Sequence, residues 1–208
     1  NQAAAQVDPT NVSPINFTVV FSKSVTGFIG TDVVLSGTAG ATTAVVTPVG
    51  TGTTFNVAVS GMTGSGTVIA TVPANGAQDT AGNGNANSTS TDNTVTYNVT
   101  PPTVTINQAA AQADPTNISP IDFTVVFSKV VTGFTNTDVV LTGTAGATTA
   151  IVTGSGTTYT VEVSGMTVTG TVIATIPVGA AQDSAGNNNT ASTSTDNTVT
   201  YDITAPTV

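Results

Sequence analysis

The sequence contains no cysteine, histidine, arginine or tryptophan, and its only basic side chains are Lys23 and Lys129. These absences exclude Ser-His-Asp and Cys-His relays, zinc or haem ligation by imidazole or thiolate, and a guanidinium clamp for phosphate. We therefore expect no enzymatic activity. The absence of cysteine also means that the fold does not depend on disulfides.

The chain also contains few positively charged residues. The chain has 11 acidic residues and a formal net charge of -9, although only 6% of its residues are charged. Nucleic-acid phosphates and anionic lipid headgroups are held mainly by Lys and Arg, so we expect neither nucleic-acid binding nor binding to a membrane surface. No apolar run of about 18 residues is present, which argues against insertion into a membrane.

The chain consists of two similar copies of one sequence. Residues 1–10 read NQAAAQVDPT and residues 107–116 read NQAAAQADPT, and the similarity continues to the end of the chain. Matching residues lie 106 positions apart in the early part of each copy and 104 apart later, where Asp183 matches Asp79. The two missing residues fall in a Gly-rich stretch between apolar runs, where a hairpin loop tolerates a change of length. A period this long indicates an array of whole domains.

The repeat sets the expected domain boundaries. Residues 1–100 form the first copy, residues 101–204 form the second, and residues 205–208 are the start of a further copy. The junction contains Pro101 and Pro102, which restrict two successive φ angles and predict a short, stiff link.

The two ends of the chain predict an incomplete first copy. The second copy begins with the lead-in PPTVTI at residues 101–106, but nothing matching it precedes Asn1. Residues 204–208, TAPTV, repeat residues 100–104, TPPTV, with no domain after them. We interpret the chain as a window on a longer array, in which the last two residues begin the strand that a next domain uses. The first copy is then expected to lack its first strand segment.

Local patterns indicate strands throughout both copies. Apolar or β-branched runs, several of them alternating with polar residues, occupy residues 15–21, 55–59, 68–72 and 94–99. Between them lie Gly, Asn, Asp, Ser and Pro, the residues that tight turns require. About seven short strands per hundred residues is typical of a Greek-key sandwich. The predicted fold is all-β, with two tandem immunoglobulin-like Greek-key β-sandwiches.

Three segments of each copy resemble the bacterial immunoglobulin-like repeats of large secreted and cell-surface proteins. In the first copy they are FSKSVTGF with TDV at residues 21–33, GAQDTAGN at residues 76–83, and VTY at residues 95–97 before the Thr-Pro-Pro-Thr junction. Lys23 and Lys129 depart from this family, which usually has an acidic residue there. The resemblance implies a sandwich of about seven strands, used as a stalk or display unit outside the cell or on the bacterial surface.

Aspartates that recur at matching positions of the two copies are the one pattern that suggests ligand binding. Eight of the ten Asp form matching pairs across the copies, and oxygen donors from Asp, Asn and turn carbonyls suit Ca²⁺. The candidate calcium ligands are Asp32, Asp79, Asn83 and Asp92 in the first copy and Asp138, Asp183, Asn187 and Asp196 in the second. No EF-hand spacing is present. The alternative is structural: Asp79 and Asp183 form Asx turns, and Asp32 and Asp138 cap a turn before a strand.

Three functions are consistent with these patterns. The leading hypothesis is a structural stalk or spacer in a bacterial adhesin or extracellular fibre, with neighbouring repeats of the same chain as its partners. The second is an adhesion module whose loops bind a host or surface glycan or protein. The third is a subunit that self-associates into an extracellular filament. The similarity of the two copies favours the spacer, because the loops of a dedicated recognition domain diverge more often.

Overall fold

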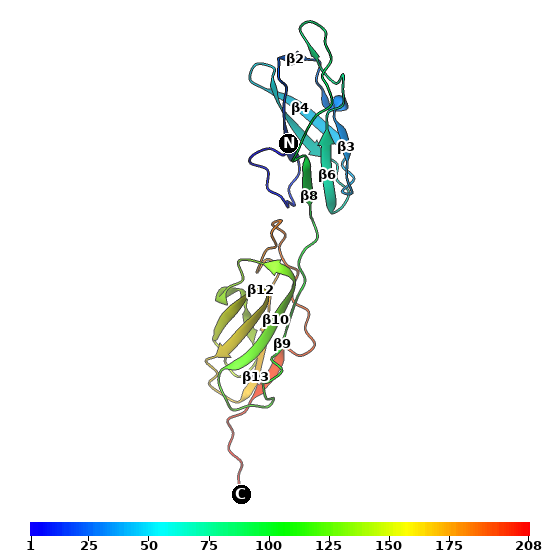
Figure 1. The fold of residues 1–208 in the computed structure, drawn as a ribbon. Coiled ribbons are helices and arrows are strands. Elements are labelled where there is room, and N and C mark those ends of the chain that lie inside the picture. The colour runs from blue at the N-terminus through cyan, green and yellow to red at the C-terminus, as the bar shows by residue number, and fades with distance from the viewer. The chain divides into compact units, whose positions relative to one another are not determined.

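The structure, a computed structural model, describes all 208 residues. It is all-β, with antiparallel strands and two short 3-10 turns. The chain divides into two compact units, Asn1–Thr100 and Pro101–Val208, so the division falls in the proline-containing junction (Figure 1). Neither 3-10 turn approaches the length that a membrane-spanning helix needs.

Two three-stranded sheets and a short ribbon make up the first unit. The sheet orders are β1-β5-β4 and β3-β6-β8, and β2 pairs with β7. The elements are β1 (Ile15–Val20), β2 (Val25–Thr26), η1 (Gly30–Asp32), β3 (Val34–Ser36), β4 (Thr43–Val49), β5 (Thr54–Ser60), β6 (Gly66–Thr71), β7 (Gln78–Asp79) and β8 (Thr94–Tyr97).

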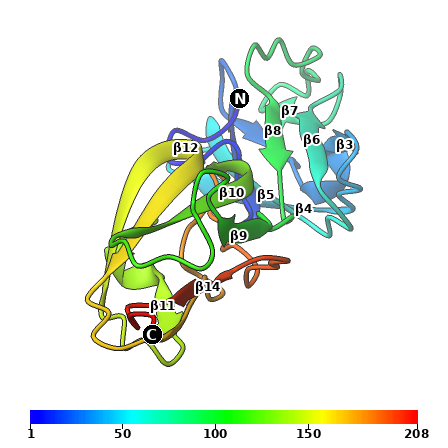
Figure 2. The ribbon, with the colours of Figure 1, turned by 90° about the horizontal axis from the view of Figure 1, so that it is seen from below.

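The second unit has the same plan with one more paired strand. Its sheet orders are β12-β10-β9 and β11-β13-β14, and β9 lies beside β10 in both views (Figures 1 and 2). The elements are β9 (Val104–Gln108), β10 (Ile121–Val131), η2 (Asn136–Asp138), β11 (Val140–Thr142), β12 (Thr149–Ser164), β13 (Gly170–Thr175) and β14 (Thr198–Tyr201).

Each unit has its own hydrophobic core, built from side chains that alternate along the strands. In β5, Phe55, Val57 and Val59 are buried while the residues between them are partly exposed, which is the period of two expected for a strand. Buried residues of both sheets contribute to each core. Three aromatic rings meet edge to face in each core, with centroids 5.2–5.8 Å apart. They are Phe21, Phe28 and Phe55 in the first unit and Phe127, Phe134 and Tyr159 in the second.

The units differ at the Gly-rich stretch where the second copy is two residues shorter. In the first unit β4 and β5 are separate strands, and Gly50 and Gly52 lie with positive φ in the turn between them. In the second unit β12 covers the corresponding region, and the chain still reverses within it: the Thr148 N–H donates to the Ser164 carbonyl at 3.1 Å, as the Thr42 N–H does to the Ser60 carbonyl in the first unit. The loss of two residues therefore shortens the turn, in which Gly154 and Gly156 have positive φ.

The larger difference is at the edge of one sheet. In the second unit β9 pairs with β10, with Ile106 opposite Val125 and Val104 opposite Phe127. No strand of the first unit occupies the corresponding edge of β1. Only the start of the chain reaches it, through a bridge between Gln2 and Phe17.

Candidate functional site

In each unit a cluster of polar side chains lies in a turn that follows the pairing of two short segments. In the first unit β2 pairs with β7, and this places Asp79 at the start of a turn that ends at Asn83. The Asp79 N–H donates to the Asn83 carbonyl at 3.0 Å, and the Gly82 N–H donates to the Asp79 carbonyl at 3.0 Å. Gly82 has a φ of 85°, a left-handed conformation that glycine adopts without steric cost.

The Asp79 carboxylate stabilises this turn from inside. Its Oδ1 accepts the backbone N–H groups of Ala81 and Asn83, both at 2.9 Å, and the Asn83 side-chain amide donates to both carboxylate oxygens. The bond to Ala81, two residues along the chain, is the Asx turn that the sequence predicts. One side chain therefore satisfies two backbone donors that the turn leaves without a backbone acceptor.

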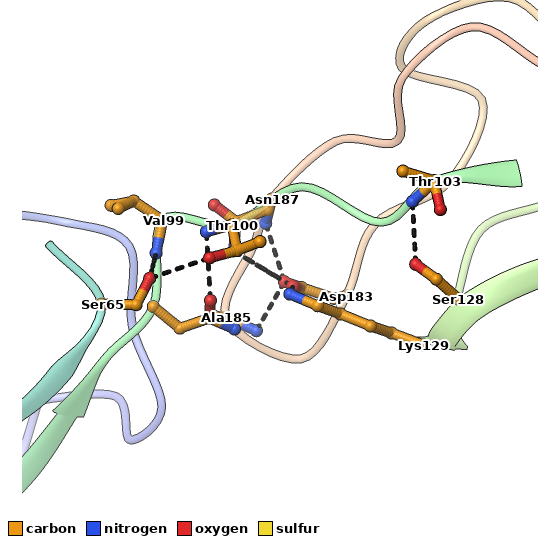
Figure 3. Close-up of polar contacts among 10 residues, drawn as sticks. Ser65, Val99, Thr100, Thr103, Ser128, Lys129, Asp183, Ala185 and Asn187 are labelled. Atoms are coloured by element: carbon orange, nitrogen blue, oxygen red, sulfur yellow. Dashed lines mark hydrogen bonds and ion pairs between the residues drawn. The ribbon is translucent and has the colours of Figure 1, made fainter.

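The second unit repeats the arrangement (Figure 3). The Asp183 Oδ1 accepts the Ala185 N–H at 3.0 Å and the Asn187 N–H at 2.9 Å, and the Asn187 Nδ2 donates to both carboxylate oxygens at 3.1 Å. The side chain of Asp183 is only 3% exposed, against 13% for Asp79. The second cluster is the more buried of the two.

A lysine from much earlier in the chain completes each cluster: Lys129 lies in β10, and Lys23 lies between β1 and β2. The Lys129 Nζ lies 3.1 Å from the Asp183 Oδ2, and the Lys129 side chain is 30% exposed. The corresponding Lys23 lies 3.4 Å from Asp79 and is 71% exposed. Since solvent screens the first-unit pair more strongly, the second-unit pair contributes more to stability. We refer to Lys23, Asp79 and Asn83, and to Lys129, Asp183 and Asn187, as the Lys-Asp-Asn clusters.

Hydrogen bonding sets the charge state of both carboxyl groups. The pKa of Asp79 is lowered to about 2, mainly by its bonds from the Asn83 side chain and backbone, with smaller contributions from Ala81 and Lys23. For Asp183 burial alone raises the pKa, but the bonds from Asn187, Lys129 and Ala185 together bring it below the usual value. Both groups are therefore ionised at neutral pH and form ion pairs with their lysines.

The other predicted calcium ligands lie in turns of their own. The Asp32 Oδ2 accepts the Ile29 N–H at 2.8 Å, and the Asp138 Oδ2 accepts the Thr135 N–H at 2.7 Å, so each carboxylate closes a 3-10 turn before a strand. Asp92 and Asp196 bind the start of their copy through their backbone. Their N–H groups donate to the Asn1 and Asn107 side chains at 3.2 and 3.1 Å.

The structure thus joins Asp79 with Asn83 and Asp183 with Asn187, but it gathers no group of three acidic residues. In each Lys-Asp-Asn cluster the carboxylate faces N–H donors and an ammonium group. A calcium ion there would have to displace the lysine and turn the Asn side chain so that its oxygen faced the ion. Calcium binding stays a prediction, and the geometry favours the alternative of structural turns.

Sequence reasoning did not identify a second feature, a cavity of about 450 Å³ in the first unit. Its walls include the apolar side chains of Phe17, Val19, Phe21 and Val57, together with the loop over residues 85–90. No local sequence pattern indicates it, because the cavity depends on how strands and loops far apart in the sequence pack together.

The comparisons with known proteins do not identify this chain further. A scan against protein-family models finds no match, and a search of curated proteins finds no similar sequence. The resemblance to bacterial immunoglobulin-like repeats therefore rests on the segments quoted above, and the function has to be argued from the geometry.

Proposed function

We propose that this chain is a structural spacer: tandem immunoglobulin-like β-sandwich repeats that form part of the stalk of a bacterial surface adhesin or extracellular fibre, without catalytic activity. The observation that carries the proposal is the equivalence of the two units. Both have their own core, the same pairing of the strands that they share and the same Lys-Asp-Asn cluster. A module specialised for recognition would differ from its neighbour in such a cluster.

Sheet order supports the immunoglobulin-like part of the proposal. Constant-type immunoglobulin domains place strands A, B, E and D in one sheet and C, F and G in the other. In the second unit β9, β10 and β12 supply the first set, since β12 spans the D and E positions, and β11, β13 and β14 supply the second. In the first unit β1, β5 and β4 match B, E and D, and β3, β6 and β8 match C, F and G.

Surface chemistry supports the spacer role. Only 13 of 208 residues carry a formal charge, 2 Lys and 11 Asp or Glu, and both lysines are already paired within their own unit. The remaining exposed positions are rich in Thr, Ser, Asn and Gly, which are hydrated without presenting a strong electric field. Such a surface attracts few partners by long-range electrostatics.

The mechanical response of the chain tests this proposal. In single-molecule stretching of the 208-residue chain, we expect two separate unfolding events. Each should release up to about 330–360 Å of chain, the contour length of roughly 100 residues, less the folded end-to-end distance of the unit. The competing adhesion hypothesis is tested on a glycan array. Specific glycan binding that is lost when the loops between strands are exchanged would overturn the spacer role.

A further inference from the structure

Asparagine followed by glycine occurs at two places in the chain, and both lie in the first unit. They are Asn75-Gly76 and Asn83-Gly84, whereas the matching positions of the second unit hold Gly179-Ala180 and Asn187-Asn188. A side-chain amide next to glycine is chemically labile, because glycine has no Cβ to keep its backbone nitrogen away from the amide carbon. The surroundings of each pair then decide whether it reacts.

Asn75 is the less constrained of the two asparagines. It lies in the turn between β6 and β7 (Figure 2), is exposed, and is the only residue other than glycine with a positive φ, 65°. Its side chain lies beside Gly84 and makes no hydrogen bond, and the Gly76 N–H donates none. No hydrogen bond therefore has to break before the Gly76 nitrogen approaches the amide carbon of Asn75.

Asn83 is held in its Lys-Asp-Asn cluster. Its Nδ2 donates to both carboxylate oxygens of Asp79, at 3.2 and 3.1 Å, and its carbonyl accepts the Asp79 N–H at 3.0 Å. The Asn85 N–H donates to the Ala77 carbonyl at 3.0 Å, so the backbone is fixed on both sides of Gly84. To react, the Asn83 side chain would have to give up both of its bonds to Asp79.

We propose that Asn75 is a site of spontaneous deamidation, which converts it to aspartate and isoaspartate, whereas Asn83 is protected. The Gly76 backbone nitrogen bonds to the Cγ of Asn75, the bond from Cγ to Nδ2 breaks, and the proton of the attacking nitrogen passes through water to the departing ammonia. Water then opens the resulting cyclic imide. Attack at one carbonyl carbon gives aspartate, attack at the other gives isoaspartate, and nothing is oxidised or reduced.

The exposure of this position does not depend on where the chain begins. Gly179, which matches Asn75, is also exposed, although the whole first unit precedes it in the chain. The strands on either side of the turn, β6 and β7, pair with other strands of the same unit.

Deamidation would change how the turn holds the loop that follows. The Asn75 N–H donates to the Asn85 carbonyl at 2.9 Å, and the Ala77 N–H donates to the Asn85 Oδ1 at 2.8 Å. Isoaspartate adds one backbone carbon between these two donors, so the pair of bonds to Asn85 loses its geometry. Either product also adds a negative charge to a chain whose net charge is already -9. We expect aged chains to be more acidic, with faster hydrogen exchange at residues 84–90.

Peptide mapping of the 208-residue chain after incubation at mildly alkaline pH tests the proposal. A protease that cleaves before aspartate separates the two sites, because Asn75 falls in peptide 32–78 and Asn83 in peptide 79–91. Aspartate formed at position 75 creates a new cleavage site. Isoaspartate is not cleaved and shows only the mass increase from amide to acid. We expect modification of Asn75 to be at least tenfold faster than that of Asn83.

Two variants and one solvent condition isolate the cause. Gly76→Ala keeps the asparagine and should slow the reaction at least tenfold, and Ala180 shows that the fold accommodates alanine there. Asn75→Gly combined with Gly76→Ala copies the second unit and should abolish modification at position 75. In urea that unfolds the chain, the two asparagines should react at similar rates, because Asp79 no longer holds Asn83.

Three outcomes would overturn the proposal. They are equal rates at Asn75 and Asn83 in the folded chain, an unmodified Asn75 in the folded chain while the unfolded chain is converted, and a Gly76→Ala variant that reacts as fast as the unaltered chain. None of these results bears on the spacer role, which rests on the stretching experiment.

Discussion

At the scale of single residues, Asp79 and Asp183 show how a short turn acquires an internal support. The spacing from the Asp to a Gly with positive φ and then to Asn lets one carboxylate accept from two backbone N–H groups. The Asn side chain then returns to the same carboxylate. Each aspartate therefore organises the whole turn, and its charge is what makes these bonds strong.

Neutralising these carboxylates should destabilise each unit in a pH-dependent way. The folded pKa values lie below the ordinary one, so the stabilisation is present above about pH 4 and is lost as the pH falls through the folded values, about 2 for Asp79. We expect Asp183→Asn to cost roughly 1–3 kcal/mol at neutral pH. Asp79→Asn should cost less because its site is more exposed. Hydrogen exchange of the full chain, followed separately in peptides of each unit, measures both effects.

The same experiment contains its own control. Between pH 4 and pH 2 the unaltered chain should lose stability, and each variant should lose less in the unit that carries the substitution. An equal pH dependence in the variants and the unaltered chain would contradict the role given to these carboxylates.

A second residue-scale prediction concerns a pair of like charges in the second unit. Asp122 lies directly opposite Glu162 in the β10–β12 pairing, and the Asp122 Oδ1 is buried without a hydrogen-bond partner. At the matching positions the first unit has Asn16 directly opposite Ala58, so no like charges meet there. Like charges on directly opposed residues destabilise a sheet.

Copying the first-unit pair into the second should therefore stabilise it. We expect the double variant Asp122→Asn with Glu162→Ala to raise the free energy of unfolding by about 0.2–1 kcal/mol, measured by urea denaturation at neutral pH. The reverse exchange, Asn16→Asp with Ala58→Glu, should lower it. A double variant less stable than the unaltered chain would show that the acidic pair is favourable.

Sequence reasoning reached part of this detail. The Asx turns could be predicted because all their partners lie within four residues of the aspartate. The lysine partners could not, since Lys23 and Asp79 are 56 residues apart and Lys129 and Asp183 are 54 apart. The tertiary fold brings each lysine to its aspartate, and no local sequence pattern predicts such a long-range contact.

At the scale of elements, β10 and its counterpart show what a neighbouring strand contributes. β10 is continuous over 11 residues, whereas the matching part of the first unit contains β1, a break, and then the two-residue β2. Alternation predicted β1 and β8, and apolar or β-branched runs predicted β5 and β6, because such patterns are visible over four or more residues. Strands as short as β2 and β7 have no period to detect, so only tertiary contacts define them.

The break between β1 and β2 should be the first site of proteolysis. Lys23 lies in it with an exposed side chain, while Lys129 lies inside β10. Trypsin cleaves after lysine, and cleavage needs locally extended, accessible backbone. We expect limited digestion of the folded chain to yield residues 1–23 and 24–208, with the bond after Lys129 cut much more slowly. Mass spectrometry of the fragments over time provides the measurement.

A matched variant tests the cause of that difference. A variant with PPTVTI, the sequence of residues 101–106, placed before Asn1 gives β1 a neighbour like the one that β9 gives β10, so it should protect the bond after Lys23. Cleavage at the same rate in both chains would mean that the break does not depend on a paired neighbour.

At the scale of the whole molecule, the sequence repeat and the two compact units coincide. The division at Thr100 falls at the junction between the copies, and each unit encloses one hydrophobic core. The division into two units could be predicted from the sequence because it depends on the spacing of the sequence repeat and not on which strands pair. The 450 Å³ cavity could not be predicted in this way, since its walls come from segments far apart in the sequence, including β1 and the loop over residues 85–90.

Calcium dependence is the prediction that belongs to this scale. We expect thermal unfolding of the chain in excess EDTA and in millimolar Ca²⁺ to coincide, because the aspartates of both units already accept bonds from N–H groups and lysines. A site filled at about 100 times its dissociation constant would add about 2.7 kcal/mol, which is easily detected as an upward shift in Tm. Such a shift would assign the paired aspartates as calcium ligands.

The single lysine in each unit has a practical consequence for labelling chemistry. Lys23 and Lys129 are the only side-chain amines, and their exposures of 71% and 30% differ enough to separate their reaction rates. After acetylation of the Asn1 α-amine, an amine-reactive fluorophore used at limiting amounts would therefore label the first unit at one defined position, Lys23. Once Asn1 is acetylated, the chain offers one fast and one slow attachment point, so a dye on each unit can be installed without introducing cysteine.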